Sequence, residues 1–132
     1  MTDEEANALN LEVAAAIGWT LWGPEDHVWD TPTWDTVHYE DNPNGLPDFC
    51  REGLMIGYLT EWLTAQGRTH FTCGTGELGG GEAYIYWRWN SWEWLESCVF
   101  GGENSTQRTI GEALCRAILA YVKLRKAQLN EN

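Results

Sequence analysis

Three histidines, four cysteines and a surplus of carboxylates are the side chains of this 132-residue chain that could do chemistry. His27 and His38 lie in an acid-rich segment, and His70 alternates with Phe71 in a strand-like run. Hydrolysis or group transfer needs a nucleophile beside a base, or paired carboxylates, and no such motif is visible. A glycine-rich run at 74–81 lacks the Lys-Ser/Thr pair of a phosphate-binding loop. We therefore expect no enzyme.

The spacing of the cysteines does not indicate a metal site. Cys50, Cys73, Cys98 and Cys115 include no Cys-x-x-Cys pair and have no histidine at zinc-ligand spacing. The acids around His27 lack the spacing of a calcium-binding EF-hand loop. Because the acidic N-terminus does not resemble a secretory signal, we expect four reduced, mostly buried thiols and no metal or other cofactor.

Negative charge is concentrated in the first half of the chain. Residues 1–66 hold thirteen acids and one base, Arg51, whereas residues 67–132 hold seven acids and seven bases. Such an acidic surface repels phosphate backbones and disfavours direct binding to nucleic acid, so a protein with a basic surface is the expected partner. The acids expected to bind it are Asp26, Asp30, Asp35, Glu40, Asp41 and Asp48. The alternative is that the acids only keep a tryptophan-rich protein in solution.

A second candidate site is the tryptophan-rich segment Trp87–Trp94. If Asn90 and Ser91 form a two-residue hairpin loop, four indoles line one face of a strand pair. The register then pairs Trp87 with Trp94, Trp89 with Trp92 and Arg88 with Glu93. These indoles would either form the core between sheet and helix or stack on a small nucleotide-type signal. The candidate ligand-binding residues are Trp87, Arg88, Trp89, Trp92, Trp94 and Arg68.

Helix and turn signals in the first half indicate which elements hold these groups. Thr2-Asp3-Glu4-Glu5 matches a capping box and predicts a helix that ends at Gly18. A short strand is expected over Trp19–Trp22. Residues 23–47 contain all four prolines, and we expect one long, irregular, acidic loop there.

A second helix is expected to begin at an Asp48 cap and to run to about Gln66, with Gly67 closing it. Its buried face would contain Leu54, Tyr58, Trp62 and Ala65. Gly53 and Gly57 lower its helix propensity, and we interpret them as points of close approach to a neighbouring element.

The second half of the sequence predicts strands and one long helix. The strands are expected at 68–75, 82–89 and 92–100. Thr109-Ile110-Gly111-Glu112 is a second capping-box pattern, and the C-terminal helix is expected to begin there or two or three residues earlier, over about 106–128. Because both faces of the expected hairpin are partly apolar, each needs a cover. We therefore expect one α+β domain over 1–132, a three-layer α/β/α sandwich with helices on both faces of a three- to four-stranded antiparallel sheet. No apolar run approaches the length that spans a membrane.

Two segments carry a resemblance to a known family. Leu9–Trp19 (LNLEVAAAIGW), followed by a proline-rich loop, resembles the start of the phage ABA sandwich domain, and Ile110–Ala120 (IGEALCRAILA) resembles its terminal helix. The resemblance implies the α/β/α fold and a small phage or prophage protein in the cytoplasm of the infected bacterial host. It implies no catalytic residues.

Charge and resemblance together lead to two hypotheses of function. The first is a non-catalytic phage accessory protein that inhibits a host anti-phage defence component through an acidic surface that imitates nucleic acid. The alternative is a phage sponge that sequesters a small nucleotide-type immune signal in a Trp/Arg-lined pocket.

Overall fold

The computed structural model describes residues 1–23, 25–32, 36–67, 69–77, 79–88, 96–100 and 109–130. In this part of the chain, three helices and two antiparallel three-stranded sheets form the α+β fold that the sequence predicts. The elements in chain order are α1 (Asp3–Ala16), β1 (Thr20–Leu21), β2 (Trp29–Asp30), β3 (Thr36–Val37), α2 (Gly53–Ala65), β4 (Thr69–Thr75), β5 (Gly81–Arg88), β6 (Glu96–Phe100) and α3 (Ile110–Asn130). No helix of the described residues is long and apolar enough to cross a membrane.

Helix α1 begins and ends where the sequence predicts. The backbone N–H of Glu5 donates to Thr2 Oγ1 at 3.2 Å, as in a capping box. Gly18 follows the helix with a φ of 89°, a left-handed conformation that glycine adopts without steric cost. The buried positions Ala6, Leu9 and Val13 place one face of α1 against the core.

The expectation of one irregular loop over 23–47 is wrong, because β2 and β3 lie within it. They join β1 in an antiparallel sheet of order β1-β2-β3, which we call the small sheet. Buried Trp29 and Val37 hold the sheet to the core, and Trp29 Nε1 donates to the carbonyl of Asn44 at 2.8 Å. Gly45 has a φ of 68° and lies so close to the His27 carbonyl that a Cβ would clash. Packing and tertiary hydrogen bonds, which the proline pattern does not reveal, thus order this segment.

Helix α2 begins at Gly53, five residues after the expected Asp48 cap, and Glu52 at its N-cap makes no side-chain capping bond. The helix is rotated relative to the prediction, since Leu54 is 91 % exposed. The buried side chains are Met55, Tyr58, Leu59 and Leu63.

The glycines in and after α2 have different roles from those that the sequence suggests. A Cβ at Gly53 or Gly57 would meet nothing within 4 Å, so neither glycine permits a close approach. Gly67 closes the helix as expected, with a φ of 70°.

Strands β4, β5 and β6 form a second antiparallel sheet, which we call the large sheet. Its register pairs Trp87 with Ser97 and Arg88 with Glu96. The expected pairings of Trp87 with Trp94 and of Arg88 with Glu93 are therefore wrong, because the observed partners lie three residues further along the chain. Residues 89–95 lie outside the described residues, and with them the predicted partners Trp89 and Trp92.

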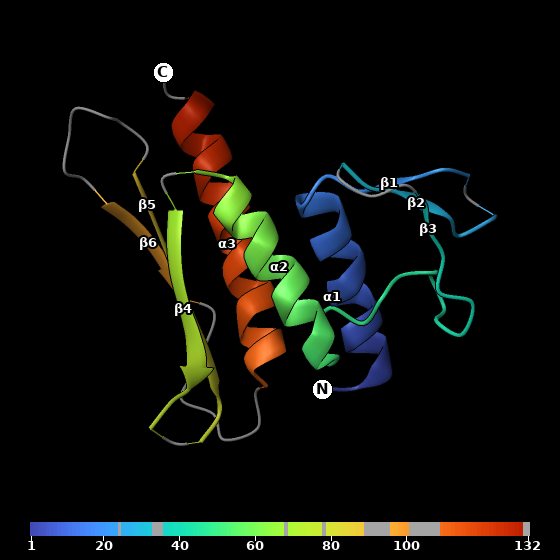
Figure 1. Ribbon diagram of the computed structural model, residues 1–132, viewed down its shortest axis with the longest axis horizontal. Helices are drawn as coiled ribbons and strands as arrows, with labels where there is room; N and C mark the ends of the chain where they lie inside the picture. The colour runs from blue at the N-terminus through green and yellow to red at the C-terminus, as the bar shows by residue number, and fades with distance from the viewer. Residues whose placement is uncertain are drawn as a thin grey trace.

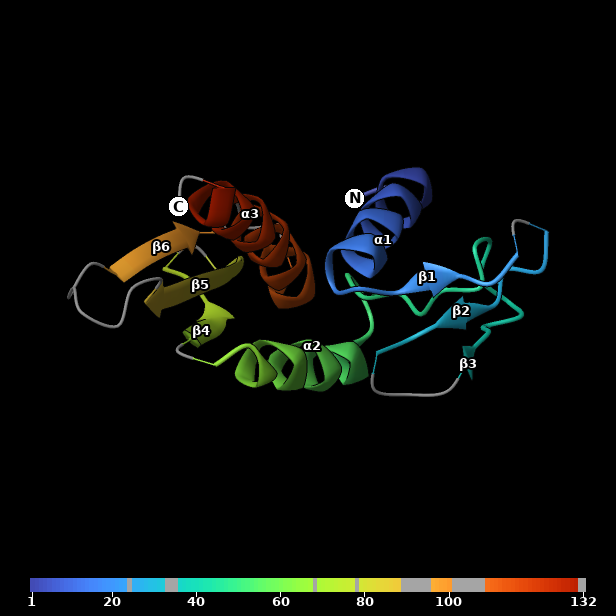
Figure 2. The same cartoon turned by 90° about the horizontal axis from the view of Figure 1, so that it is seen from above.

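Helices α2 and α3 lie on the same side of the large sheet (Figures 1 and 2). Ala83, Ile85 and Trp87 alternate along β5 and are fully buried on this side, where α3 packs against the sheet. On the opposite face, Tyr84 and Tyr86 are half-buried, and no helix of the described residues covers them. The helix on the second face, and with it the three-layer sandwich, stays a prediction.

The C-terminal helix confirms the expected strong periodicity. Glu112 N–H donates to Thr109 Oγ1 at 3.1 Å, as the second capping box predicts, and α3 begins at Ile110. Its side chains Leu114, Ile118 and Tyr121 join one hydrophobic cluster with residues of α1, α2 and both sheets.

Candidate functional site

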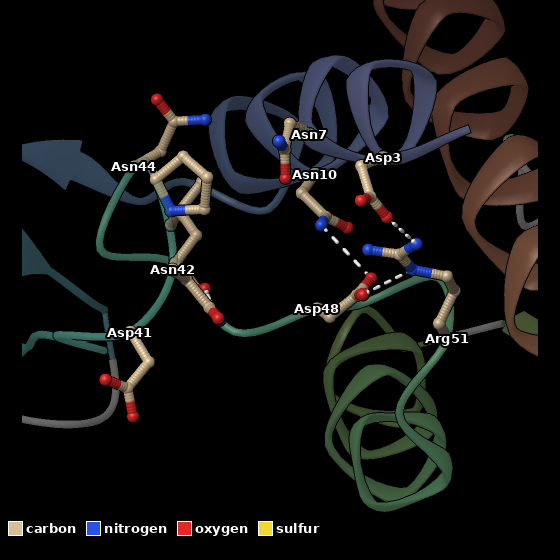
Figure 3. Close-up of a pocket in the computed structure, with 10 residues that line it drawn as sticks. Asp3, Asn7, Asn10, Asp41, Asn42, Asn44, Asp48 and Arg51 are labelled. Atoms are coloured by element: carbon tan, nitrogen blue, oxygen red, sulfur yellow. Dashed lines mark hydrogen bonds and ion pairs between the residues drawn. The ribbon is translucent and has the colours of Figure 1, made fainter. Parts of the chain in front are cut away.

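A polar pocket of about 300 Å³ lies between α1 and the segment 41–51 (Figure 3). Aspartate and asparagine side chains form most of its wall, and Arg51 is the one cation among its lining residues. The polar side chains that line it include Asp3, Asn7, Asn10, Asp41, Asp48 and Arg51.

Arg51 is held by two carboxylates at one side of this pocket. Its Nη1 donates to Asp3 Oδ1 at 2.7 Å and its Nε donates to Asp48 Oδ2 at 2.6 Å. These hydrogen bonds, that of Asp3 first, raise the pKa of the guanidinium. Asn10 Nδ2 donates to the other oxygen of Asp48 at 3.2 Å (Figure 3). The side chain of Asp48 therefore links α1 to Arg51. The prediction that Asp48 caps the second helix is wrong.

Asn10 connects the pocket to two buried thiols. Its Oδ1 accepts a hydrogen bond from Cys50 Sγ at 3.0 Å. The hydrogen bond with Cys50, and then burial, raise the pKa of the Cys115 thiol well above its ordinary value. A protonated thiol is a poor nucleophile, so Cys115 has the character of a core residue rather than of a reactive one.

The expectation for the cysteines is confirmed at two positions. Cys50 and Cys115 are free and buried, but Cys73 is exposed, because it lies on the edge strand β4. The side chain of Cys98 lies outside the described residues.

Four of the acids expected to bind a partner lie in or next to the small sheet. Asp30 belongs to β2, Asp26 lies in the turn before it, and Glu40 and Asp41 follow β3. We call these four residues the acidic patch. Within the described chain none of them forms an ion pair, whereas Asp48 does so with Arg51. The sixth predicted acid, Asp35, lies outside the described residues.

Part of the acidic half of the sequence forms one end of the molecule. Figures 1 and 2 show α1 and the small sheet at one end of the long axis and the large sheet at the other, with α2 and α3 near the middle. The acidic patch thus lies beside the small sheet, whereas the bases after residue 66 whose side chains the structure describes, which are Arg116, Lys123, Arg125 and Lys126, lie on α3. Within the described residues, the acids of the patch and these bases belong to different parts of the fold.

Trp22 is a surface residue of this acidic end that sequence reasoning missed. Its side chain is 70 % exposed, whereas Trp19, three residues earlier, is buried against Phe49 and Tyr58. The signal was available in the sequence, because side chains alternate along a strand. Alternation over Trp19–Trp22 places the two indoles on opposite faces.

The structure removes Trp87 from the alternative, ligand-binding site. Its ring is fully buried, lies 4.8 Å from the Tyr121 ring in an edge-to-face contact, and donates from Nε1 to Gln128 Oε1 at 2.9 Å. A side chain enclosed by α3 has no face left for a ligand. The other residues of this candidate site lie outside what the structure describes: Trp89, Trp92, Trp94, Arg68 and the side chain of Arg88.

The histidines form no reactive constellation in the part of the chain that the structure describes. His38 Nδ1 lies 2.9 Å from the carbonyl oxygen of His27, which makes this histidine a link between strands of the small sheet. No group of three or more metal-ligating side chains comes together among the described residues.

Comparisons with known proteins leave the family open. No family model, no curated protein and no solved structure matches the chain. The resemblance to the phage ABA sandwich domain therefore stays a prediction.

Proposed function

We propose that this protein is a non-catalytic binding protein whose acidic end attaches to a basic surface of a partner protein. The observation that carries the proposal is the acidic patch beside the small sheet, whose carboxylates are unopposed by described cations. With the resemblance stated above, the partner would be a bacterial defence component and the protein its phage-encoded inhibitor.

Electrostatics favours this type of partner. Unpaired surface carboxylates steer a basic protein toward the acidic end and repel polyanions. Arg51 does not weaken this field near the patch, because Asp3 and Asp48 neutralise it. A protein surface that normally binds a phosphate backbone has the matching charge. The acidic end would compete with nucleic acid for that surface.

The same charge disfavours the sponge hypothesis at the polar pocket. Asp3, Asp41 and Asp48 line it, and their carboxylates would repel the phosphates of a nucleotide. With Trp87 buried, no observation on the described residues supports nucleotide sequestration.

Capture of proteins from a bacterial lysate tests the proposal, with duplex DNA as a competitor that reveals nucleic-acid mimicry. Immobilised protein should retain one or a few basic proteins, and an excess of duplex DNA should elute them, because DNA and the acidic end use the same surface. Proteins that remain bound in excess DNA would contradict nucleic-acid mimicry.

A variant and a matched control locate the binding surface. The patch variant carries Asp26→Asn, Asp30→Asn, Glu40→Gln and Asp41→Asn. The control carries Glu4→Gln, Glu12→Gln, Glu61→Gln and Glu77→Gln, exposed acids outside the patch that change the net charge by the same amount. The patch variant should lose the captured proteins and the control should keep them. Retention by the patch variant would refute the proposal.

A further inference from the structure

We infer that the outer face of the small sheet recognises arginine side chains, with Trp22 as its aromatic centre and carboxylates of the acidic patch beside it. The inference rests on the proposed function and deepens it, because it names the side chain of the basic partner that this face selects.

The register of the small sheet places Trp22 on the face that points away from the core. Leu21 pairs with Trp29 and Trp29 with Val37, and the last two are buried. Side chains on either side of these positions point to the opposite face. Trp22 N–H donates to the carbonyl of Val28 at 2.8 Å, so the ladder of β1 and β2 continues to this residue.

The strand register and a turn place two acids of the acidic patch near the position of Trp22 in the chain fold. Asp30 pairs with Thr20 and lies on the same face, diagonal to Trp22, where long side chains come within reach of each other. Asp26 N–H donates to the carbonyl of Gly23, and its carboxylate turns back toward this neighbour of Trp22. A Cβ at Gly23 would lie 3.2 Å from Asp26 Oδ2.

An exposed indole with carboxylates on neighbouring positions fits a guanidinium better than an ammonium group. Guanidinium is planar, stacks on an aromatic face and offers several donors in its plane to carboxylates. Lysine carries the same charge, but its compact, strongly hydrated ammonium cannot stack in this way. This face should therefore prefer arginine over lysine at equal net charge, and Trp22 should be the origin of that preference.

Two short peptides of equal length and charge, one rich in arginine and one rich in lysine, test the inference. Each is labelled and titrated with the protein, and binding is followed by fluorescence anisotropy. The parent should bind the arginine peptide more tightly, and Trp22→Ala should weaken that binding about three- to tenfold while changing the lysine peptide less than about twofold. Trp22→Phe, which keeps an aromatic face, should retain part of the preference.

Leu54→Ala is the matched control, because Leu54 on α2 is also a large and highly exposed apolar residue. It should leave both affinities unchanged, and circular dichroism should show that each variant is folded. Equal affinity of the parent for both peptides, or an equal loss of both in Trp22→Ala, would overturn the inference and leave the proposed function standing. Absence of binding to either peptide would overturn the proposed function as well.

Discussion

At the scale of the residue, Trp87 shows how a side chain suited to ligand stacking serves the core instead. Its ring fills the space between β5 and α3, and its one polar atom is satisfied by Gln128. Truncation would remove the packing against Tyr121 and leave a cavity.

We expect Trp87→Ala to lower the free energy of unfolding by about 3–5 kcal/mol. Urea denaturation monitored by circular dichroism measures this value, with Trp22→Ala as a surface control that should change it by less than about 0.5 kcal/mol. A loss below about 1 kcal/mol for Trp87→Ala would contradict its placement in the core.

The buried thiol of Cys115 makes a prediction about alkaline pH. Its pKa is raised in the folded state, so the folded protein holds a proton that the unfolded chain releases above about pH 8.5. The stability that this proton contributes is complete below that pH and is lost as the pH rises toward the folded-state pKa.

The free energy of unfolding should therefore fall more steeply between about pH 8.5 and 10.5 in the parent than in Cys115→Ala, by up to about 1.4 kcal/mol per pH unit. Urea titrations of both proteins across this range measure the difference, because the other titrating groups are common to the two. Parallel curves would show that the thiol does not titrate differently on folding.

At the scale of the element, two helical glycines have opposite environments. Gly57 in α2 is open to solvent, and a Cβ there would meet nothing within 4 Å. Gly111 in the first turn of α3 is buried, and a Cβ there would lie 2.5 Å from the carbonyl oxygen of Cys50. The same carbonyl accepts from Thr109 Oγ1 at 3.1 Å, so it is held in place.

We expect Gly57→Ala to stabilise the protein by about 0.5–1 kcal/mol through helix propensity. Gly111→Ala should destabilise it by about 1–3 kcal/mol, because the methyl group displaces the chain at Cys50. Thermal unfolding of the two variants checks both signs. A stabilised Gly111→Ala would contradict the close contact between α3 and this segment.

The sequence predicted elements better than it predicted their contacts. Capping residues and periodicity located α1 and α3 well, because these signals are local. The start of α2 was misplaced because Asp48, a good capping residue, is used by Arg51 and Asn10 instead. The hydrogen bond with Asn10 depends on a residue 38 positions earlier in the chain.

The register between β5 and β6 was also predicted wrongly, again because it depends on more than a local signal. The assumption of a two-residue turn at Asn90 shifted every pair of β5 and β6, although the strands themselves were located within a few residues. The loop length decides the pairing and leaves no periodic signal in the sequence. The sequence predicted β1 but missed β2 and β3 of the small sheet, because these strands are only two residues long and are held by tertiary packing.

At the scale of the whole molecule, the fold gathers four acids of the first sequence half in or next to the small sheet, at one end of the molecule (Figures 1 and 2). The surplus of acids in the first half was visible in the sequence, but the position of the acidic patch on the same sheet as the exposed Trp22 was not. If the acids form a binding surface, their position on the molecule matters. If they only keep the protein in solution, their number alone matters. The alternative stated at the outset, that acidity only keeps the protein in solution, requires only the amount.

The central claim, that the position of the acidic patch confers binding, is tested most directly by calorimetric titration of one captured basic partner. The parent, the patch variant and the matched control variant are compared at about 0.15 M salt, where surface charges more than about 8 Å apart are largely screened. We predict about tenfold or greater weakening for the patch variant and less than about threefold for the control. Equal weakening in the two variants would contradict the account, because net charge and not the small sheet would then determine binding.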